Sequence, residues 1–156
     1  IDRGHTKIAG YFKSDDIQGH QRYSGFISEL FRSGLIIPDE NVFWYTTETK
    51  ENLFDDPEEV LKRLGDNTAV VCYNDEVAFG LVKCLLSAGR RVPEDVAVVS
   101  FDNSNLSWIS QVPITSLSYE DRNIGRIAAQ KLVDILDGRD VSSEVLPWTF
   151  IQKESS

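Results

Sequence analysis

Two residue types are scarce in this sequence: methionine is absent from its 156 residues, and cysteine occurs only at Cys72 and Cys84. A natural chain begins with methionine, so its absence predicts that the sequence is a piece of a longer protein. Both cysteines fall inside apolar segments, so we expect two buried thiols rather than a disulfide. The two histidines, His5 and His20, have no third histidine and no matching cysteine, so no metal site is expected.

Long apolar runs and basic clusters are also missing. No apolar run reaches the length of a membrane span, and the first five residues lack a secretory pattern. The net charge is −9, whereas a DNA-binding surface is normally basic. With 41% hydrophobic residues, the chain can build one domain with a real core. These features favour an acidic cytoplasmic protein that has no membrane partner and does not bind DNA phosphates itself.

Motifs typical of nucleotide-binding proteins and hydrolases are absent too. There is no GxGxxG, no P-loop and no Gly-x-Ser-x-Gly elbow. Four acidic residues could be interpreted as catalytic carboxylates: Asp15, Asp16, Glu48 and Asp102. Paired acids act as general acid and base only where the surroundings separate their pKa values, and no pattern indicates that here. We therefore expect no catalytic residue, no cofactor and no enzyme.

The most informative stretch is a predicted strand, helix and strand. Residues 69–73 form a short apolar run typical of a strand covered on both faces, and Asn74 suits the cap of the following helix. That helix is predicted from about Asp75 to Ala88, with an apolar stripe formed by Val77, Ala78, Leu81, Leu85 and Leu86. A second buried strand, Val96 to Phe101, ends at Asp102. Such a crossover makes the strands parallel neighbours, so Asn74 and Asp102 should lie side by side at the carboxyl edge, where open sheets bind ligands.

The same alternation runs through the rest of the chain. Further strands are predicted at Ile8–Phe12, Asn41–Tyr45, Ile114–Tyr119 and Val145–Ile151, and further helices at about 19–33, from Asp56, and at about Asp121–Leu136. In the first helix, Arg22 is expected near the carboxyl end of the first strand, and the buried face should consist of Tyr23, Phe26, Ile27, Leu30 and Phe31. This pattern predicts an α/β fold with a mainly parallel sheet and helices on both faces.

The central stretch resembles the effector-binding core of the lactose-repressor/galactose-repressor family of bacterial transcription regulators. The matching residues are Asn74-Asp75, Ala78, Gly80, Gly89, Val92-Pro93, Asp95-Val96 and Phe101-Asp102. The family has a periplasmic-binding-protein-like fold of two lobes with the effector between them. The resemblance implies that residues 1–113 form the second lobe and that residues 114–156 supply a crossover strand, a helix and a strand of the first lobe. Most of the first lobe and the DNA-binding domain would then be absent.

The first half resembles, more narrowly, the arabinose repressors of this family in Gram-positive bacteria. The most distinctive match is Lys13-x-Asp15-Asp16, and it continues with Arg22, Gly25-Phe26 and Thr46-Thr47-Glu48. The candidate ligand-binding residues are therefore Arg22, Asn74 and Asp102, to which this resemblance adds Lys13 and Asp15. A guanidinium offers a planar donor fork to sugar hydroxyls, a carboxylate accepts from them, and an amide can do both. The alternative role for each residue is a helix cap or a surface ion pair.

Together these features predict the sugar-sensing segment of a transcriptional repressor. We expect it to bind L-arabinose or another pentose and to reach operator DNA through a domain outside this chain. The resemblance also implies a homodimer, and Phe79, Val82 and Cys84 are expected to add apolar surface for it on the central helix. None of the three tryptophans is assigned to the ligand site. The alternative function is a sugar-binding component of a transport system, which shares the two-lobe fold.

Overall fold

The computed structural model describes residues 1–119 and 124–156, which are built around one six-stranded sheet. The strand order is β2-β1-β3-β4-β5-β6, with bounds Val42–Tyr45, Ile8–Lys13, Ala69–Cys72, Ala97–Phe101, Thr115–Ser118 and Thr149–Ile151. Neighbouring strands are parallel, except that β6 runs antiparallel to β5. The predicted α/β fold with a mainly parallel sheet is confirmed.

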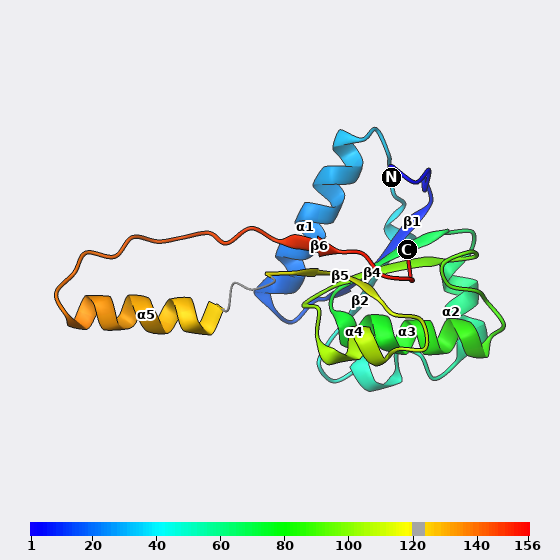
Figure 1. The fold of residues 1–156 in the computed structure, drawn as a ribbon. Coiled ribbons are helices and arrows are strands. Elements are labelled where there is room, and N and C mark those ends of the chain that lie inside the picture. Colours follow the sequence, from blue (N-terminus) through cyan, green and yellow to red (C-terminus); the bar gives the residue numbers. More distant parts are fainter. Residues whose placement is uncertain (120–123) are drawn as a thin grey trace.

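Helices cover both faces of this sheet (Figure 1). One face carries α1, Ile17–Arg32, and the other carries α2, Pro57–Leu64, α3, Asp75–Ser87, and the short α4, Asn105–Ile109. Two 3-10 turns flank β2, η1 at Asp39–Asn41 and η2 at Lys50–Asn52. In contrast, α5, Ile124–Leu136, projects away from the sheet, and an extended segment leads back from it to β6 (Figure 1).

Local side chains fix where the helices begin. Asp16 caps α1 by accepting a hydrogen bond from the Gly19 backbone N at 2.6 Å, and Asp56 and Asn74 cap α2 and α3 in the same way. A Cβ atom added at Gly19 would lie 1.8 Å from the carbonyl oxygen of Lys13. Only glycine therefore lets α1 begin this close to the end of β1, beside the carboxyl edge of the sheet.

The core lies mainly between the sheet and the helices α2 and α3. Val70, Cys72 and Val98 are fully buried there, because side chains alternate across a strand and these three face α3. The intervening Val71 and Val99 face the side of α1 and are only half-buried. Cys72 and Cys84 are free and buried, as predicted.

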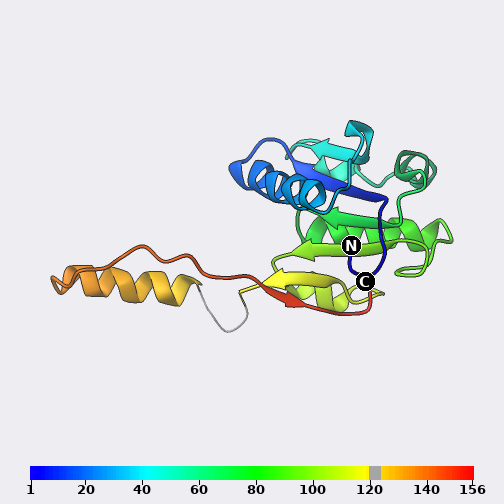
Figure 2. The same cartoon turned by 90° about the horizontal axis from the view of Figure 1, so that it is seen from above.

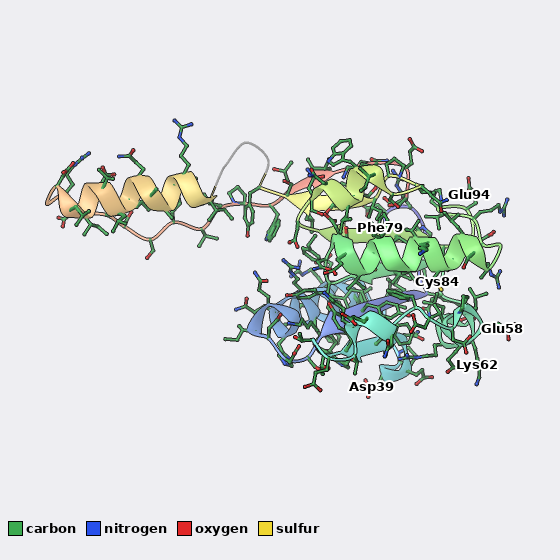
Figure 3. The ribbon with its side chains drawn as sticks, turned by 90° about the horizontal axis from the view of Figure 1, so that it is seen from below. Asp39, Glu58, Lys62, Phe79, Cys84 and Glu94 are labelled. Atoms are coloured by element: carbon green, nitrogen blue, oxygen red, sulfur yellow. The ribbon has the colours of Figure 1, made fainter. Side chains whose placement is uncertain are left out.

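The central helix α3 is buried on more sides than the sequence predicts. Its predicted stripe is buried at Val77, Ala78, Leu81 and Leu85. Val82 and Cys84 are also buried, at 1% and 4% exposed, and Phe79 is half-buried against the core. Two neighbours cause this: α4, a helix that the sequence did not predict, packs along α3 on the side of Phe79 and Val82, and Cys84 lies on the other side, toward the start of α2 (Figure 3). The prediction that Val82 and Cys84 add exposed surface for a dimer is therefore wrong.

The buried face of α1 is narrower than expected. Leu30 is buried and Tyr23, Phe26 and Ile27 are half-buried, but Phe31 is 80% exposed. α1 packs mainly on β1, and Leu30 in its last turn faces the strand, so Phe31, about 100° further around the helix, points away from it. The expectation that Phe31 faces the sheet is wrong for this reason.

The last two strands differ from the expected division into lobes. β5 pairs in parallel with β4, for example Phe101 with Leu117, and β6 pairs with β5, so both strands extend the sheet of residues 1–113. Their polar residues fit a buried position because they are hydrogen-bonded: Ser116 Oγ donates to Asp75 at 2.7 Å, and Thr115 N donates to Ser155 Oγ at 2.9 Å. The boundary expected at residue 113 is therefore not a break in this sheet.

α5 shows the opposite behaviour, because its apolar side chains find no layer to cover. Leu132, Val133, Ile135 and Leu136 are all exposed. The predicted start of this helix, Asp121, lies outside the described residues. That α5 belongs to a first lobe stays a proposal, and its exposed apolar residues are consistent with it.

Candidate functional site

The carboxyl edge of the sheet collects the predicted ligand residues. β5 ends on the side from which the chain leaves toward α5, and the parallel strands β1 to β4 end on that side too (Figure 2). Val71 on β3 pairs with Val99 on β4. Asn74 and Asp102 each follow three residues after this pair, so they lie at equivalent positions on neighbouring strands, as predicted.

Arg22 and Asp102 form an ion pair at this edge, although they are 80 residues apart in the sequence. Arg22 Nη2 lies 3.0 Å from Asp102 Oδ1, and Arg22 Nη1 donates to the backbone carbonyl of Tyr73. The Arg22 side chain is 9% exposed, whereas that of Asp102 is 44% exposed. The guanidinium is thus anchored below the surface, and Asp102 presents its other carboxylate oxygen to solvent.

Aromatic rings hold the Arg22 guanidinium in one plane. Its central carbon lies 4.8 Å from the ring centre of Tyr73, 4.6 Å from that of Phe101 and 6.0 Å from that of Trp148. Such contacts between a cation and a ring face are attractive, and they also exclude water from the guanidinium. Arg22 is therefore a fixed donor rather than a mobile surface arginine.

The backbone at Asp102 adopts an unusual conformation. Asp102 has a φ of 97° and Asn103 a φ of 48°, which is the left-handed region that favours glycine. Hydrogen bonds hold both residues there: Asp102 N donates to Leu117 O at 2.9 Å and Asn103 N donates to Ser116 Oγ at 3.0 Å. Strained non-glycine residues of this kind occur often at ligand sites, where the strain fixes a side chain in its working position.

Asn74 caps α3, which is the structural role that the sequence left open, and it also has an amide nitrogen that is not used by the cap. Its Oδ1 caps α3 by accepting from Val77 N at 3.1 Å. Its Nδ2 has no hydrogen-bond partner within residues 1–119 and 124–156. The cap fixes the orientation of the amide, so this nitrogen remains as a donor at the edge of the sheet.

Lys13 and Asp15 lie in a second cluster at the end of β1. Lys13 Nζ lies 3.5 Å from Asp15 and 3.3 Å from Asp16. Hydrogen bonds from the Thr47 hydroxyl and then the Thr47 backbone N lower the pKa of Asp15 to about 2. This carboxylate is therefore committed to holding the loop after β2.

Tyr73 joins the two clusters. Its hydroxyl donates to Asp16 at 2.8 Å, its carbonyl accepts from Arg22, and its ring lies against the same guanidinium. Burial, and then the bond to Asp16, raise the pKa of Tyr73 to about 12, so it remains a neutral donor. Burial alone would raise the pKa of Asp16, but hydrogen bonds from Gly19, Tyr73 and Lys13 lower it.

A cavity of about 490 Å³ opens on the face of the sheet beside α1. Of the five predicted residues only Arg22 lines it, together with Phe101, Leu117, Tyr119 and Trp148. Trp148 and Tyr119 stack with ring centres 4.0 Å apart. The predicted ligand residues therefore lie at the carboxyl edge of the sheet, and this cavity lies next to them on the half-buried face of the sheet.

Sequence reasoning missed three contributors to this site: Tyr73, Phe101 and Trp148. Tyr73 and Phe101 are the last apolar residues before Asn74 and Asp102, so their position at the ends of two predicted strands was an available signal. Trp148 is 75 residues from Tyr73 in sequence and arrives through the pairing of β6 with β5, which no local pattern indicates.

Two further searches concern the described residues alone. Within residues 1–119 and 124–156, no group of three or more histidine, cysteine, aspartate or glutamate side chains could hold a metal ion. No helix in that part of the chain is both long and apolar enough to span a bilayer.

Comparison with known proteins places this geometry in a family. A Periplasmic binding protein-like domain matches residues 1–156. The arabinose metabolism transcriptional repressor of Halalkalibacterium halodurans is 35% identical over 142 residues, which cover 88% of this chain and 37% of that protein. The chain thus spans well under half of the length of this relative.

Solved structures show the same architecture. The transcriptional regulator CelR in complex with cellobiose has a TM-score of 0.85 at 30% identity, covering 100% of this chain and 48% of its own. A sugar-binding transcriptional regulator of the LacI family from Escherichia coli, complexed with phosphate, has a TM-score of 0.86 at 25% identity, covering 100% of this chain and 56% of its own.

Proposed function

The chain belongs to the family of periplasmic binding protein-like domains, and on that premise we propose that it is the sugar-sensing part of a transcriptional repressor. Its relatives described above are named as transcriptional regulators, and the solved ones as binding cellobiose or as sugar-binding. The effector we propose is a pentose such as L-arabinose. The sugar would bind at the carboxyl edge of the sheet and change the affinity of the whole protein for its operator.

The observation that carries this proposal is the anchored Arg22 beside the exposed carboxylate of Asp102. Arg22 is held by Tyr73 and Asp102 and is almost entirely buried, while an oxygen of Asp102 and the Nδ2 of Asn74 remain available. A sugar hydroxyl is both a donor and an acceptor, so it can donate to the carboxylate and accept from the amide or the guanidinium at the same time. Fixed groups lose little entropy when they bind such a ligand.

The aromatic residues at this edge suit the remaining surface of a sugar. A pyranose or furanose ring has apolar C–H faces between its hydroxyl groups. Phe101 and Trp148 lie next to Arg22 and line the adjacent cavity, so they offer apolar surface directly beside the polar groups. Small-molecule sites typically combine a few placed polar groups with such a lining.

Lys13 and Asp15 contribute to the site in a different way from Arg22 and Asp102. They neutralise each other and Asp15 is already bonded to Thr47, so in this arrangement their contribution is to shape the wall of the site. The proposal of a pentose follows from the likeness to arabinose repressors in this region. The likeness to CelR, which binds the disaccharide cellobiose, makes the size of the sugar the first property to test.

DNA binding and dimerisation belong, in this proposal, to the whole cytoplasmic repressor. A net charge of −9 opposes contact between this chain and DNA phosphates, so the operator would be bound by a domain outside it. A homodimer is proposed as well, but through surfaces other than the buried Val82 and Cys84.

The experiment is a thermal-shift panel on the full-length protein with L-arabinose, D-xylose, D-ribose and cellobiose. A sugar at 100 times its Kd should raise the Tm by about 5 °C, since it binds only the folded state. We expect a pentose, and L-arabinose first, to produce this shift, and cellobiose to produce none. A shift with cellobiose alone would overturn the pentose assignment, and no shift with any sugar would overturn sugar sensing.

A further inference from the structure

The last residues of the chain lie beside the first residues of β4 and β5. After β6, Ser155 is fully buried between β4 and β5: its hydroxyl donates to Val98 O and accepts from Thr115 N, and its backbone N donates to Pro113 O at 3.0 Å. Lys153 N donates to Thr115 Oγ1 at 2.9 Å. The backbone at Lys153 is therefore held in place by the sheet itself.

The Lys153 ammonium group uses all three of its donors on the loop between β4 and β5. It donates to Asn103 Oδ1 at 2.7 Å, to Ser107 Oγ at 2.7 Å and to Ile114 O at 3.0 Å. It also lies 4.2 Å from the ring centre of Trp108. Burial lowers the pKa of Lys153, and the negative charge of Asp75 acts in the opposite direction. A lysine with three partners and a ring face is a structural cation rather than a surface charge.

The groups that Lys153 binds sit at both ends of that loop. Asn103 directly follows Asp102, and both have left-handed backbones. Ser107 lies in α4 and Ile114 immediately precedes β5. Lys153 thus links the residue after Asp102 to the far end of the loop. Without it Asn103 would keep its backbone bond to Ser116 and the longer bond, 3.4 Å, that its Oδ1 accepts from Ser107 Oγ.

We propose that Lys153 is a positioning residue for the effector site: it holds Asn103 and α4 so that Asp102 keeps the left-handed conformation that aims its carboxylate at Arg22. The inference rests on the proposed function for its consequence, which is effector affinity, but the geometry of the loop can be tested without any ligand. Lys153 follows α5 and β6 in the chain, so it also ties this loop to the point where the chain returns from α5.

The first test measures amide hydrogen exchange in the chain without sugar. Lys153→Met keeps an unbranched side chain but removes the ammonium group and its three donors. We expect the backbone amides of Asn103, Ser104 and Ser107 to exchange about tenfold faster, since the loop that carries them loses its bonds to the ammonium group, while β4 remains protected. Lys153→Arg, which retains the cation, should restore much of the protection. Unchanged exchange at these amides in Lys153→Met would overturn the inference.

The second test measures L-arabinose affinity in the full-length protein. Lys153→Met should weaken binding about tenfold. Ser155→Ala is the matched control, because it removes a hydroxyl of the same terminal segment that bonds Val98 O and Thr115 N but not the loop. It should change the affinity little, even where it lowers stability as much as Lys153→Met does. Equal losses of affinity in the two variants would mean that Lys153 only supports the fold, and would overturn the inference.

A double mutant keeps the inference testable if Lys153→Met folds poorly. Asn103→Gly keeps the left-handed backbone and removes the acceptor, so Lys153→Met added to it should have a smaller effect on loop exchange than in the wild type. Full additivity would contradict the link between the two residues. If the wild-type protein binds no pentose, the proposed function fails, while the exchange measurements still decide whether Lys153 holds the loop.

Discussion

Arg22 and Asp102 are 80 residues apart in the sequence, yet Arg22 Nη2 lies 3.0 Å from Asp102 Oδ1. The pair joins the first turns of α1 to the end of β4, across the carboxyl ends of β1 and β3. An isolated pair of this kind at a surface stabilises a fold little. Its burial on the arginine side and its exposure on the aspartate side fit a binding site better than a structural bridge.

The buried Asp75 should matter more for stability than any surface carboxylate. It is 1% exposed and accepts from Ser100 Oγ, Ser116 Oγ and Ser104 N. Asp75→Ala leaves these donors unpaired, so we expect the free energy of unfolding to fall by about 3 kcal/mol. Glu76→Ala, which removes the exposed partner of Lys50, should cost about 0.5 kcal/mol or less. Urea denaturation measures both, and equal effects would contradict this account of the network.

Gly19 and Gly25 form a matched pair within α1. Alanine at Gly19 would place its Cβ 1.8 Å from the carbonyl oxygen of Lys13, whereas nothing lies within 4 Å of a Cβ at Gly25. We expect Gly19→Ala to destabilise the chain by about 3 kcal/mol and to displace the start of α1, as overpacking does. Gly25→Ala should stabilise it by about 0.5 kcal/mol, because alanine favours the helix. Thermal unfolding distinguishes them, and a harmless Gly19→Ala would show that α1 does not approach β1 so closely.

The Asp15 carboxyl should titrate far below its ordinary pKa. Hydrogen bonds from Thr47 lower the pKa from 3.8 to about 2 in the folded chain. Because the folded pKa is the lower one, the stabilisation is present above about pH 4 and is lost as the pH falls toward about 2. NMR titration of the carboxyl carbon should show this, and Thr47→Val, which removes the hydroxyl donor, should move the pKa back toward 3.8. A wild-type pKa near 3.8 would contradict the hydrogen bonds to Thr47.

The sequence predicted the edge of the sheet well because that edge depends on local patterns. Short apolar runs ending in Asn74 and Asp102 predicted two buried parallel strands, and helical spacing predicted the stripe of α3 between them; both are confirmed. The position of Arg22 followed from the phase of α1. The ion pair itself could not be predicted, because its distance depends on how three strands are ordered.

The sequence predicted the polar interior poorly. Ser100, Ser116 and Ser155 look like surface residues by type, yet all three are buried, because Asp75, Thr115 and the backbone of β4 supply their hydrogen bonds. α4 was missed since its five residues are too few to show a period. Missing α4 also led to the wrong prediction that Val82 is exposed, whereas Cys84 is buried on the side of α3 that faces α2.

The chain alone should bind a pentose much more weakly than the full-length protein. Asp102 is 44% exposed at an open edge, so water competes for each hydroxyl hydrogen bond, which then keeps only about 0.5–1.5 kcal/mol of net value. A second lobe would enclose the sugar from the other side and exclude that water. Calorimetric titration of L-arabinose into both proteins should give an affinity at least about tenfold lower for the chain alone. Equal affinities would show that one lobe suffices.

The most direct test of the effector site is calorimetric titration of L-arabinose into the full-length protein and into three of its variants. Arg22→Met and Asp102→Asn should each weaken binding about tenfold or more, since each removes a charged hydrogen-bonding partner of the sugar. Arg63→Met is the control: Arg63 also stacks on a ring, 4.7 Å from the centre of Phe43, but far from the carboxyl edge. We predict wild-type affinity for Arg63→Met. Wild-type affinity for Arg22→Met would contradict the placement of the site.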